Sequence, residues 1–475
     1  RVGTPDLDNT HGGESRDSAI ATGALPLDDD HAAIARSLWE ITNRGYRQAM
    51  SSFLRTKTSA GVRAEEEDQS PDFSKEQPQA HIEILPLTVV DKAAWEQRIR
   101  SIAAVFRQYP EVESSVVIFT VQDEDHYFVN TEGTRLVSPV RMSRLFLLVA
   151  GRAADGMELT RMESFQGTSP DKLPSLAELT PKIAKMVSDL KALKSAPIAE
   201  PFSGPALLSG RAAAVLTHEV LGHRLEGQRQ RGDDEGQTFT KKINQLVLPA
   251  FLSVADDPTR KSFGPTELSG TYSFDDEGMP AQDVKLIEDG VLKHFLLSRM
   301  PVKGFQNSNG HGRAETGKVP VGRQGNLIVT ATKSEPEAKL RQDFIAEIKR
   351  QGKPYGLYFD DIQGGFTLTT RQLPQAFQVL PILVWRVYPD GRPDELVRGV
   401  DLVGTPLAAF SHIMAAGDTE HVFNGICGAE SGSVPVSAVA PAMLFSEFET
   451  QRRAQSHERP PILPPPAASD PGGAQ

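Results

Sequence analysis

Two histidines flank a glutamate in the segment 210–227, and their spacing restricts how this part of the chain can fold. Residues 212–216 are mostly good helix formers, so we expect a helix here. Histidines that share a metal ion on one helix are usually four residues apart, which places them about 40° apart around the axis. His218 and His223 are five residues apart, or about 140°, so sharing an ion requires the helix to bulge or end between them. We expect this distortion at Gly222.

The single cysteine of the chain lies far from this helix in sequence, in the turn-rich apolar segment 423–437. A lone cysteine is most often a small buried apolar side chain. Zinc accepts thiolate and imidazole ligands together, however, and a catalytic zinc site combines three protein ligands with a fourth position open to water. His218, His223 and Cys427 make up such a set. Glu219 lies beside the first histidine and is then a candidate general base.

Other charged residues near these motifs have more than one interpretation. Glu226 follows His223 by three residues, so a helix would bring the two to the same side. Glu226 could be a metal ligand, but a solvated surface carboxylate or a hydrogen-bond partner of an imidazole is favoured. Arg313 and Glu315 either anchor a peptide terminus or pair with each other. The charged segment 229–237 predicts a solvated loop, with a substrate lid as the alternative.

The H-E-x-x-x-H motif and the distant cysteine resemble those of the TldD/PmbA family of zinc metallopeptidases. Further segments are similar to sequence blocks of this family: 270–282, 286–292, 308–313 and 356–365. The likeness extends over roughly residues 200–450. It implies that His218, His223 and Cys427 bind Zn²⁺ and that Glu219 is the general base. The implied activity is zinc-dependent hydrolysis of peptide bonds in flexible or unfolded peptides.

The resemblance also implies a partner, TldE, which looks like the peptidase but lacks the metal residues and assembles with it as a heterodimer. Because Glu219 and all three ligands are present here, the chain resembles the catalytic member, acting as a homodimer or with a TldE-like subunit. The alternative is a non-catalytic peptide-binding subunit with a structural zinc. Such a zinc would need a fourth protein ligand, such as Glu226.

The order of helix and strand patterns indicates an α+β fold. We expect an α/β N-terminal domain over 1–197 and a C-terminal metallopeptidase domain over 198–450, with a mainly antiparallel β-sheet that carries the metal-binding helix. The Pro-rich tail 451–475 is expected to be disordered. Helices are expected at 32–54, 92–108, 175–193, 335–352 and 407–415. Strands are expected at 114–120, 126–130, 135–137, 144–152, 205–208, 284–287, 291–297, 326–332, 356–359, 378–387 and 395–400, with an interdomain link at 198–204.

Composition argues against several classes of function. A net charge of −11 at pH 7 is unfavourable for a nucleic-acid-binding surface, which depends on clustered Lys and Arg. No apolar stretch is long enough to span a bilayer. The chain begins with Arg1 instead of Met, so we expect that a preceding segment has been removed or is missing. A cytoplasmic location is expected, with a periplasmic or secreted one as the alternative.

Overall fold

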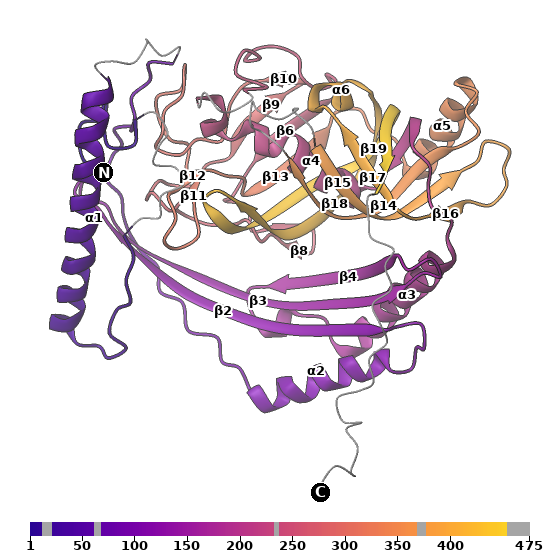
Figure 1. The fold of residues 1–475 in the computed structure, drawn as a ribbon, viewed down its shortest axis with the longest axis horizontal. Helices are drawn as coiled ribbons and strands as arrows, with labels where there is room; N and C mark the ends of the chain where they lie inside the picture. The colour runs from indigo at the N-terminus through magenta and orange to yellow at the C-terminus, as the bar shows by residue number, and fades with distance from the viewer. Residues whose placement is uncertain (12–20, 61–67, 232–236, 368–376, 454–475) are drawn as a thin grey trace, which may run out of the picture.

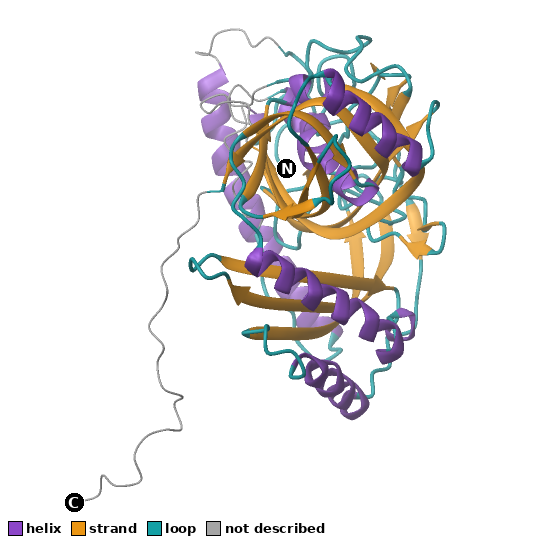
Figure 2. Cartoon of the chain, turned by 90° about the vertical axis from the view of Figure 1, so that its right-hand side faces the viewer, coloured by secondary structure: helices purple, strands orange, loops and turns teal. Residues whose placement is uncertain are grey.

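The computed structural model describes residues 1–11, 21–60, 68–231, 237–367 and 377–453. They form an α+β fold, as the sequence predicted, in which a curved N-terminal sheet lies beside a larger, strand-rich C-terminal domain (Figure 1). Figure 2 shows the same two parts from the side, with the C-terminal strands curving around a helix. No helix in these ranges combines the length and the apolar character that crossing a bilayer requires.

The N-terminal domain is a four-stranded sheet with two helices, α2 and α3, packed on one face. Its elements are α1 (His31–Ala60), β1 (Ala80–Ile82), α2 (Lys92–Phe106), β2 (Ser114–Val129), β3 (Arg135–Arg152), β4 (Glu158–Gly167) and α3 (Leu176–Ser195). Strand β3 is central and pairs antiparallel with β2 and β4 and parallel with β1. Leu145, Leu147 and Val149 alternate along β3 and form a buried core with α2 and α3. The apolar alternation of β3 therefore decides which face the helices cover.

Two N-terminal strands are longer than predicted, and two, β1 and β4, were not predicted. Ranges 114–120 and 126–130 belong to β2, and ranges 135–137 and 144–152 belong to β3. The polar run in the middle of β2 does not break the strand, because Asp123 accepts a hydrogen bond from the Thr88 hydroxyl (2.7 Å) and the backbone remains paired with β3. Strand β4 was missed because the buried Arg161 interrupts its apolar pattern.

The C-terminal domain is built on an 11-stranded, mainly antiparallel sheet. Five of its strands close into a ring in the order β5–β14–β15–β17–β19, since β19 pairs with both β17 and β5. The elements are β5 (Phe202–Leu208), α4 (Gly210–Val220), β6 (Leu252–Asp256), β7 (Ser262–Phe263), β8 (Thr266–Glu267), β9 (Val284–Glu288), β10 (Val291–Leu292), β11 (Gly312–Arg313), β12 (Val321–Gly322), β13 (Asn326–Ala331), α5 (Glu337–Arg350), β14 (Gly356–Thr367), β15 (Phe377–Val387), β16 (Glu395–Val397), β17 (Val400–Gly404), α6 (Pro406–Ser411), β18 (Ile413–Ala429) and β19 (Gly432–Arg452).

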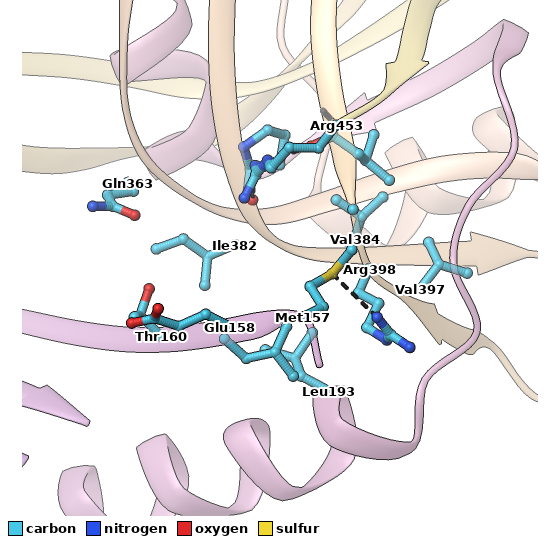
Figure 3. Close-up of a pocket in the computed structure, with 14 residues that line it drawn as sticks. Met157, Glu158, Thr160, Leu193, Gln363, Ile382, Val384, Val397, Arg398 and Arg453 are labelled. Atoms are coloured by element: carbon cyan, nitrogen blue, oxygen red, sulfur yellow. Dashed lines mark hydrogen bonds between the residues drawn. The ribbon is translucent and has the colours of Figure 1, made fainter. Parts of the chain in front are cut away.

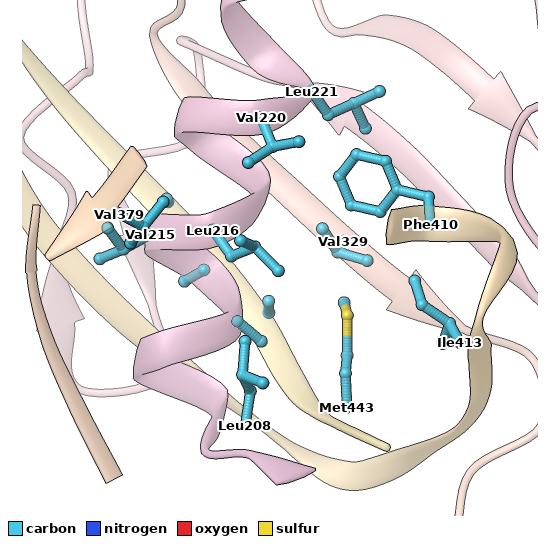
Figure 4. Packing of buried hydrophobic residues seen from close by; sticks show 14 of the residues in the cluster. Leu208, Val215, Leu216, Val220, Leu221, Val329, Val379, Phe410, Ile413 and Met443 are labelled. Atoms are coloured by element: carbon cyan, nitrogen blue, oxygen red, sulfur yellow. The ribbon is translucent and has the colours of Figure 1, made fainter. Parts of the chain in front are cut away.

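Helix α4 lies inside the core of this domain. It begins at Ser209, whose side chain accepts the backbone N–H of Ala212 (3.1 Å) as an N-cap. Every residue of α4 except Arg211 is buried. Figure 4 shows Leu216 and Val220 packed in the same cluster as Phe410. A helix that is apolar all round is typical of a fully enclosed element, so α4 is a rigid support for the side chains at its end.

Several predicted C-terminal elements were wrong in extent or type. The predicted strand 291–297 is limited to β10, and 395–400 divides into β16 and β17. The predicted helix 407–415 is the shorter α6, since β18 begins at Ile413. Segment 423–437 is not mainly turns: it belongs to the β18–β19 hairpin. Strand β5 begins at Phe202, inside the predicted link, and β19 continues through Arg452, while 454–475 lie outside the described residues.

A buried group of ion pairs joins the two domains. Arg161 on β4 donates to Asp361 on β14 (2.7 Å) and lies 3.4 Å from Asp189 of α3. Arg211, in the first turn of α4, lies 3.1 Å from the same Asp361. A buried charge left without its partner costs about 3–5 kcal/mol. These contacts therefore fix the N-terminal sheet against α4 and β14.

The junction of the domains also contains a cavity of ≈ 170 Å³. Figure 3 shows it between Met157 and Leu193 of the N-terminal domain and Val384 of the C-terminal domain. Arg398 closes one side, and its guanidinium donates to the carbonyl of Ala196 (2.8 Å). None of the residues predicted to bind metal lines this cavity. The cavity therefore lies apart from the predicted metal ligands.

Candidate metal centre

The helix that carries the first histidine ends close to the place where the sequence predicted a distortion. Helix α4 stops at Val220, and a 3₁₀ helix, η3 (Gly222–Leu225), follows Leu221. His218 lies in the last turn of α4 and His223 lies in η3, so they do not share one continuous helix. The two imidazole rings are 5.0 Å apart between centroids, at 73° to each other. The five-residue spacing is thus compatible with one shared ion.

Gly222 is needed because of the side chain that packs against it. A Cβ atom at this position would lie 1.9 Å from Oε1 of Gln324, far inside normal contact distance. Gln324 in turn donates from Nε2 to the backbone carbonyl of His218 (3.3 Å). The missing side chain at Gly222 therefore allows Gln324 to hold the last turn of α4. The sequence predicted a helix distortion at this glycine, but gave no sign that another side chain packs against it.

Cys427 reaches the histidines from β18, where it lies opposite Val434 of β19. Its Sγ is 3.3 Å from Nε2 of His223, and the ligand atoms of His218, His223 and Cys427 all lie within 4.8 Å of one another. At typical Zn–N and Zn–S lengths, a nitrogen and a sulfur bound to one tetrahedral zinc are about 3.6 Å apart. Nδ1 of His218 is buried and has no hydrogen-bond partner among the described residues. The donor set and its spacing fit a single zinc ion.

The charges of these side chains favour a bound cation. Burial alone would raise the pKa of the Cys427 thiol, but His223 and His218 outweigh burial and hold this pKa well below its usual value. Burial would lower the pKa of each imidazole, yet Cys427 and Glu219 raise that of His218, and Glu226 and Cys427 raise that of His223 well above its usual value. A metal ion would replace the protons that these rings otherwise hold.

Glu226 is fully buried and contacts the opposite side of the His223 ring. Its Oε1 lies 3.0 Å from Nδ1, whereas Cys427 faces Nε2. Burial would raise the pKa of Glu226, but His223, Arg229 and Arg323 lower it to about 2. The solvated surface position that the sequence allowed is therefore wrong. The contact fits the other favoured interpretation, a carboxylate that orients a metal-binding imidazole.

Arg323 links Glu226 to the turn that follows Cys427, and sequence reasoning missed it. Its guanidinium is fully buried. Nη2 donates to the carbonyl of Cys427 (2.8 Å), and Nη1 donates to the Ser431 hydroxyl (2.8 Å) and to the carbonyl of Gly432 (3.0 Å). Nε lies 3.6 Å from Oε1 of Glu226. One guanidinium thus connects the carboxylate behind His223 with the hairpin that supplies the thiolate.

Glu219 is held by the neighbouring strand β14. Its Oε1 accepts the backbone N–H of Gly365 (3.1 Å). Its Oε2 lies 3.9 Å from Nε2 of His223, the same nitrogen that faces Cys427. One carboxylate oxygen is therefore anchored by the backbone while the other lies at the edge of the His–His–Cys cluster. This arrangement suits a group that exchanges a proton beside a metal ion.

Arg313 and Glu315 do not pair with each other. Arg313 is buried and donates to the carbonyls of Gln324 (2.6 Å) and Pro435 (2.9 Å). Glu315 accepts the backbone N–H of Ser433 (3.0 Å) near the tip of the β18–β19 hairpin. Both residues thus support backbone segments that flank the metal centre, and neither belongs to the His–His–Cys cluster.

The prediction of a solvated loop after the metal-binding helix was wrong for its first residues. Arg229 lies in a second 3₁₀ helix, η4 (Gly227–Gln230), and contacts Glu430 (2.7 Å). Arg231 donates to the carbonyl of Pro71 (2.6 Å). These contacts fix the start of the segment against the rest of the protein. Residues 232–236 lie outside the described residues.

A buried aspartate also supports the centre without an obvious sequence signal. Asp256 accepts the backbone N–H groups of Gly325 (3.0 Å) and Asn326 (2.9 Å), and lies 3.3 Å from Nε2 of the fully buried His311. This network fixes the chain at Arg323 and Gln324, just before β13. In the sequence this site is marked only by a pair of polar residues between two glycines ahead of a strand, a pattern that does not point to the metal residues.

Comparisons with known proteins find relatives that are named as metallopeptidases. A family model described as the PmbA/TldA metallopeptidase C-terminal domain matches residues 202–452. A "Metalloprotease TldD homolog" of Haemophilus influenzae is 29% identical over 248 residues, which are 51% of this chain and 47% of that protein. A "Zinc metalloprotease TldD homolog" of Saccharolobus solfataricus is 25% identical over 210 residues, which are 43% of this chain and 45% of that protein. The chain thus spans about half the length of these curated relatives.

A similar fold is present in the crystal structure of TldE from Thermococcus kodakarensis. The TM-score is 0.55 at 14% sequence identity, and the match covers 85% of each chain. At this identity the likeness concerns the fold alone. The match extends beyond the C-terminal domain, because its share of this chain is larger than that domain.

Proposed function

Because this chain belongs to the TldD/PmbA metallopeptidase family, we propose that it is a zinc-dependent peptidase that hydrolyses flexible or unfolded peptides. His218, His223 and Cys427 would hold the ion, and Glu219 would be the general base. The observation that carries the proposal is the convergence of these four side chains, from three separate elements, around one point. The printed name of the Saccharolobus relative supports zinc as the metal.

In the proposed reaction, zinc supplies a Lewis acid for the peptide carbonyl and a water of lowered pKa. Glu219 takes the proton of the attacking water on Oε2 and passes it to the leaving amine. The N–H of Gly365 keeps the other carboxylate oxygen in place, so that the proton is exchanged at one defined atom. Glu226 holds Nδ1 of His223 and thereby leaves Nε2, which faces Cys427, free to bind the ion.

The burial of the centre supports an unfolded peptide as the substrate. His218, Glu219, His223 and Cys427 are each less than 10% exposed. A folded protein cannot bring its backbone to such a position, whereas a single extended strand can. We therefore expect structured regions of a protein to resist cleavage.

The alternative is a non-catalytic peptide-binding subunit with a structural zinc. A closed site needs a fourth protein ligand. The position of Glu226 on the Nδ1 side of His223 disfavours it as that ligand, because Cys427 faces the opposite nitrogen, Nε2. The presence of Glu219 also favours the catalytic subunit, acting as a homodimer or with a TldE-like partner. The TldE structure is similar in fold, which makes such a partner a reasonable candidate.

The test compares the parent protein with Glu219→Gln, each alone and with a candidate TldE-like subunit. Zinc content is measured together with hydrolysis of an unfolded protein such as casein. We expect stoichiometric zinc in both proteins and hydrolysis reduced by about 10²–10⁴-fold in Glu219→Gln. Glu288→Gln, at an exposed position, is the matched control and should hydrolyse like the parent. Stoichiometric zinc without hydrolysis in any of these proteins would instead support a structural zinc in a binding subunit.

A further inference from the structure

Helix α4 runs along the edge of strand β14 that β5 leaves open. Strand β5 pairs with β14 only as far as Phe359, and within the described residues no strand pairs with this edge beyond that point. Helix α4 follows β5 directly and takes its place. The backbone N–H of Ser209 donates to the carbonyl of Phe359 (2.9 Å), and the Ser209 hydroxyl donates to the carbonyl of Asp360 (2.8 Å). The start of α4 is therefore attached to β14.

The far end of α4 contacts the same strand through the proposed base. Glu219 accepts the backbone N–H of Gly365 (3.1 Å). From Arg211 to Glu219 the helix advances about 12 Å, at about 1.5 Å per residue. From Asp361 to Gly365 the strand advances about 13 Å, at about 3.3 Å per residue. Because these two lengths match, a contact between Arg211 and Asp361 at one end is compatible with the contact between Glu219 and Gly365 at the other.

The pairing of β14 with its other neighbour, β15, does not fix this alignment by a regular ladder. Between Phe359 and Gly364 the ladder has three register shifts, and Asp360 and Gln363 are left without a partner in β15. Successive N–H groups of a strand point to opposite edges, so a slip by one residue would turn the N–H of Gly365 away from α4. The position of Gly365 therefore needs a further contact that holds β14 among its bulges.

The side chain of Asp361 supplies such a contact. Its Oδ2 accepts a hydrogen bond from Arg161 of β4 (2.7 Å), and its Oδ1 lies 3.1 Å from Nε of Arg211 in the first turn of α4. The carboxylate is buried between these two cations. Arg161 also lies 3.4 Å from Asp189, and Arg211 lies 3.4 Å from Glu163, so each arginine keeps another acidic neighbour if Asp361 is replaced.

We infer that Asp361 is a positioning residue for the general base, because it fixes the register of β14 against α4 and so keeps the N–H of Gly365 beside Glu219. Arg161 makes the N-terminal sheet part of this arrangement. The inference rests on the proposed function, in which Glu219 is the base. The three candidate metal ligands lie on α4, η3 and β18, so a slip of β14 would disturb the base and leave the ligands in place.

The first experiment measures zinc content and the kinetics of casein hydrolysis for Asp361→Asn in the full chain, with the TldE-like subunit if the parent requires it. The new amide has a single oxygen, so it can accept from only one of the two arginines. We expect kcat to fall by about 10–100-fold, with KM and zinc content unchanged. Glu347→Gln is the matched control, because Glu347 is also a buried carboxylate paired with an arginine but lies on α5, and its kcat should equal that of the parent.

Replacement of Arg211 tests whether the charge beside Asp361 is what matters. Arg211→Gln should lower kcat as Asp361→Asn does, whereas Arg211→Lys keeps a cation beside Asp361 and should recover most of the activity of the parent.

The second experiment needs no activity: it measures hydrogen exchange at the amide of Gly365 in the metal-free chain by mass spectrometry. In the parent this amide is held by Glu219 and should exchange slowly. We expect exchange at least about 10-fold faster in Asp361→Asn and also in Glu219→Ala, which lacks the acceptor. Glu347→Gln should exchange like the parent.

The two experiments together separate the possible results. Exchange at Gly365 that is unchanged in Asp361→Asn would overturn the inference whatever the rate of hydrolysis. Faster exchange with hydrolysis like that of the parent, or loss of zinc together with hydrolysis, would also overturn it. If the parent itself hydrolyses nothing while Asp361→Asn exchanges faster, the proposed peptidase activity is wrong, but Asp361 still fixes the register of β14.

Discussion

Replacing Gly222 with alanine should disturb the metal centre, because the new methyl group would overlap the side chain of Gln324. The Cβ would lie 1.9 Å from Oε1, 2.3 Å from Cδ and 2.6 Å from Nε2 of Gln324. Non-bonded heavy atoms are normally about 3.5–4 Å apart, so relief requires a shift of more than about 1 Å. Either Gln324 leaves the carbonyl of His218, or the turn that carries His223 moves away from Cys427.

The expected loss of stability follows from these two possible movements. Overpacking a buried site costs about 1–3 kcal/mol, and leaving a buried carbonyl without its donor costs about 1–3 kcal/mol more. Because relief needs only one of the two movements, and each costs about 1–3 kcal/mol, we expect the free energy of unfolding of the metal-free Gly222→Ala chain to fall by about 1–3 kcal/mol. Zinc affinity should fall by about 10–100-fold, since both histidines flank the disturbed turn.

Shortening Gln324 should remove the obstacle. Gln324→Ala alone loses one hydrogen bond to His218 and should cost about 1 kcal/mol. The double variant Gly222→Ala/Gln324→Ala should be more stable than Gly222→Ala alone, which corresponds to a favourable interaction energy of about 1–2 kcal/mol in the double-mutant cycle. Urea denaturation gives the stability, and competition with a chromophoric chelator gives the zinc affinity.

Gly428→Ala is the matched control for this cycle. Gly428 is next to Cys427, but a Cβ there would have nothing within 4 Å, so the variant should bind zinc like the parent. If Gly222→Ala binds zinc as the parent does, or if the double variant is as damaged as the sum of the single variants, the close approach of Gln324 is not the reason for the glycine.

Three further predictions concern the same domain. Glu226→Gln should lower zinc affinity by about 10–100-fold in chelator competition, and an unchanged affinity would contradict its role in orienting His223. Zinc at about 100 times its dissociation constant should stabilise the parent by about 2.7 kcal/mol in thermal unfolding but should leave Cys427→Ala unchanged; equal stabilisation of both would exclude the thiolate as a ligand. Burial and the carboxylate of Glu277 raise the pKa of Asp275 well above its usual value, and burial raises the pKa of Glu277. A carboxyl group whose pKa is higher in the folded state than in the unfolded state stabilises the fold, and this stabilisation is complete below the unfolded value of about 4. It is lost as the pH rises through the higher pKa of the folded state. Glu277→Gln should therefore lose less stability than the parent between about pH 5 and about pH 8, as measured by urea denaturation, and equal losses would show that the two acids do not interact.

The sequence was sufficient to predict helices and strands whose own residues show a clear apolar pattern or a capping residue. Helix α3 was predicted because it has a regular apolar face and starts at Ser175, which forms a capping box with Glu178. The β18–β19 hairpin was not predicted, since its glycines and small residues read as turns and its stability comes from strands elsewhere in the sheet. Pairing of Phe202 with Thr450 closes the ring, and no local pattern connects residues so far apart.

For the proposed metal centre, the sequence offered candidates for the metal ligands and the base, but not the residues that hold them in place. His218, Glu219 and His223 stand in one motif, and the chain has a single cysteine, so these candidates could be named directly. Arg323 and Gln324 could not, because their roles depend on which backbone carbonyls lie opposite them after folding. A buried arginine far from the motif has no distinguishing mark in a single sequence.

The position of Cys427 near the C-terminal end has a consequence for the life of the newly made protein. A nascent chain that has emerged only as far as β17 already contains both histidines and Glu219, but it has neither the thiolate nor the strand that closes the ring. In the proposed mechanism such a chain cannot assemble its ligand set, and the same holds for copies clipped before β18. If the proposed mechanism holds, proteolytic competence is therefore acquired last, when translation of this domain is complete.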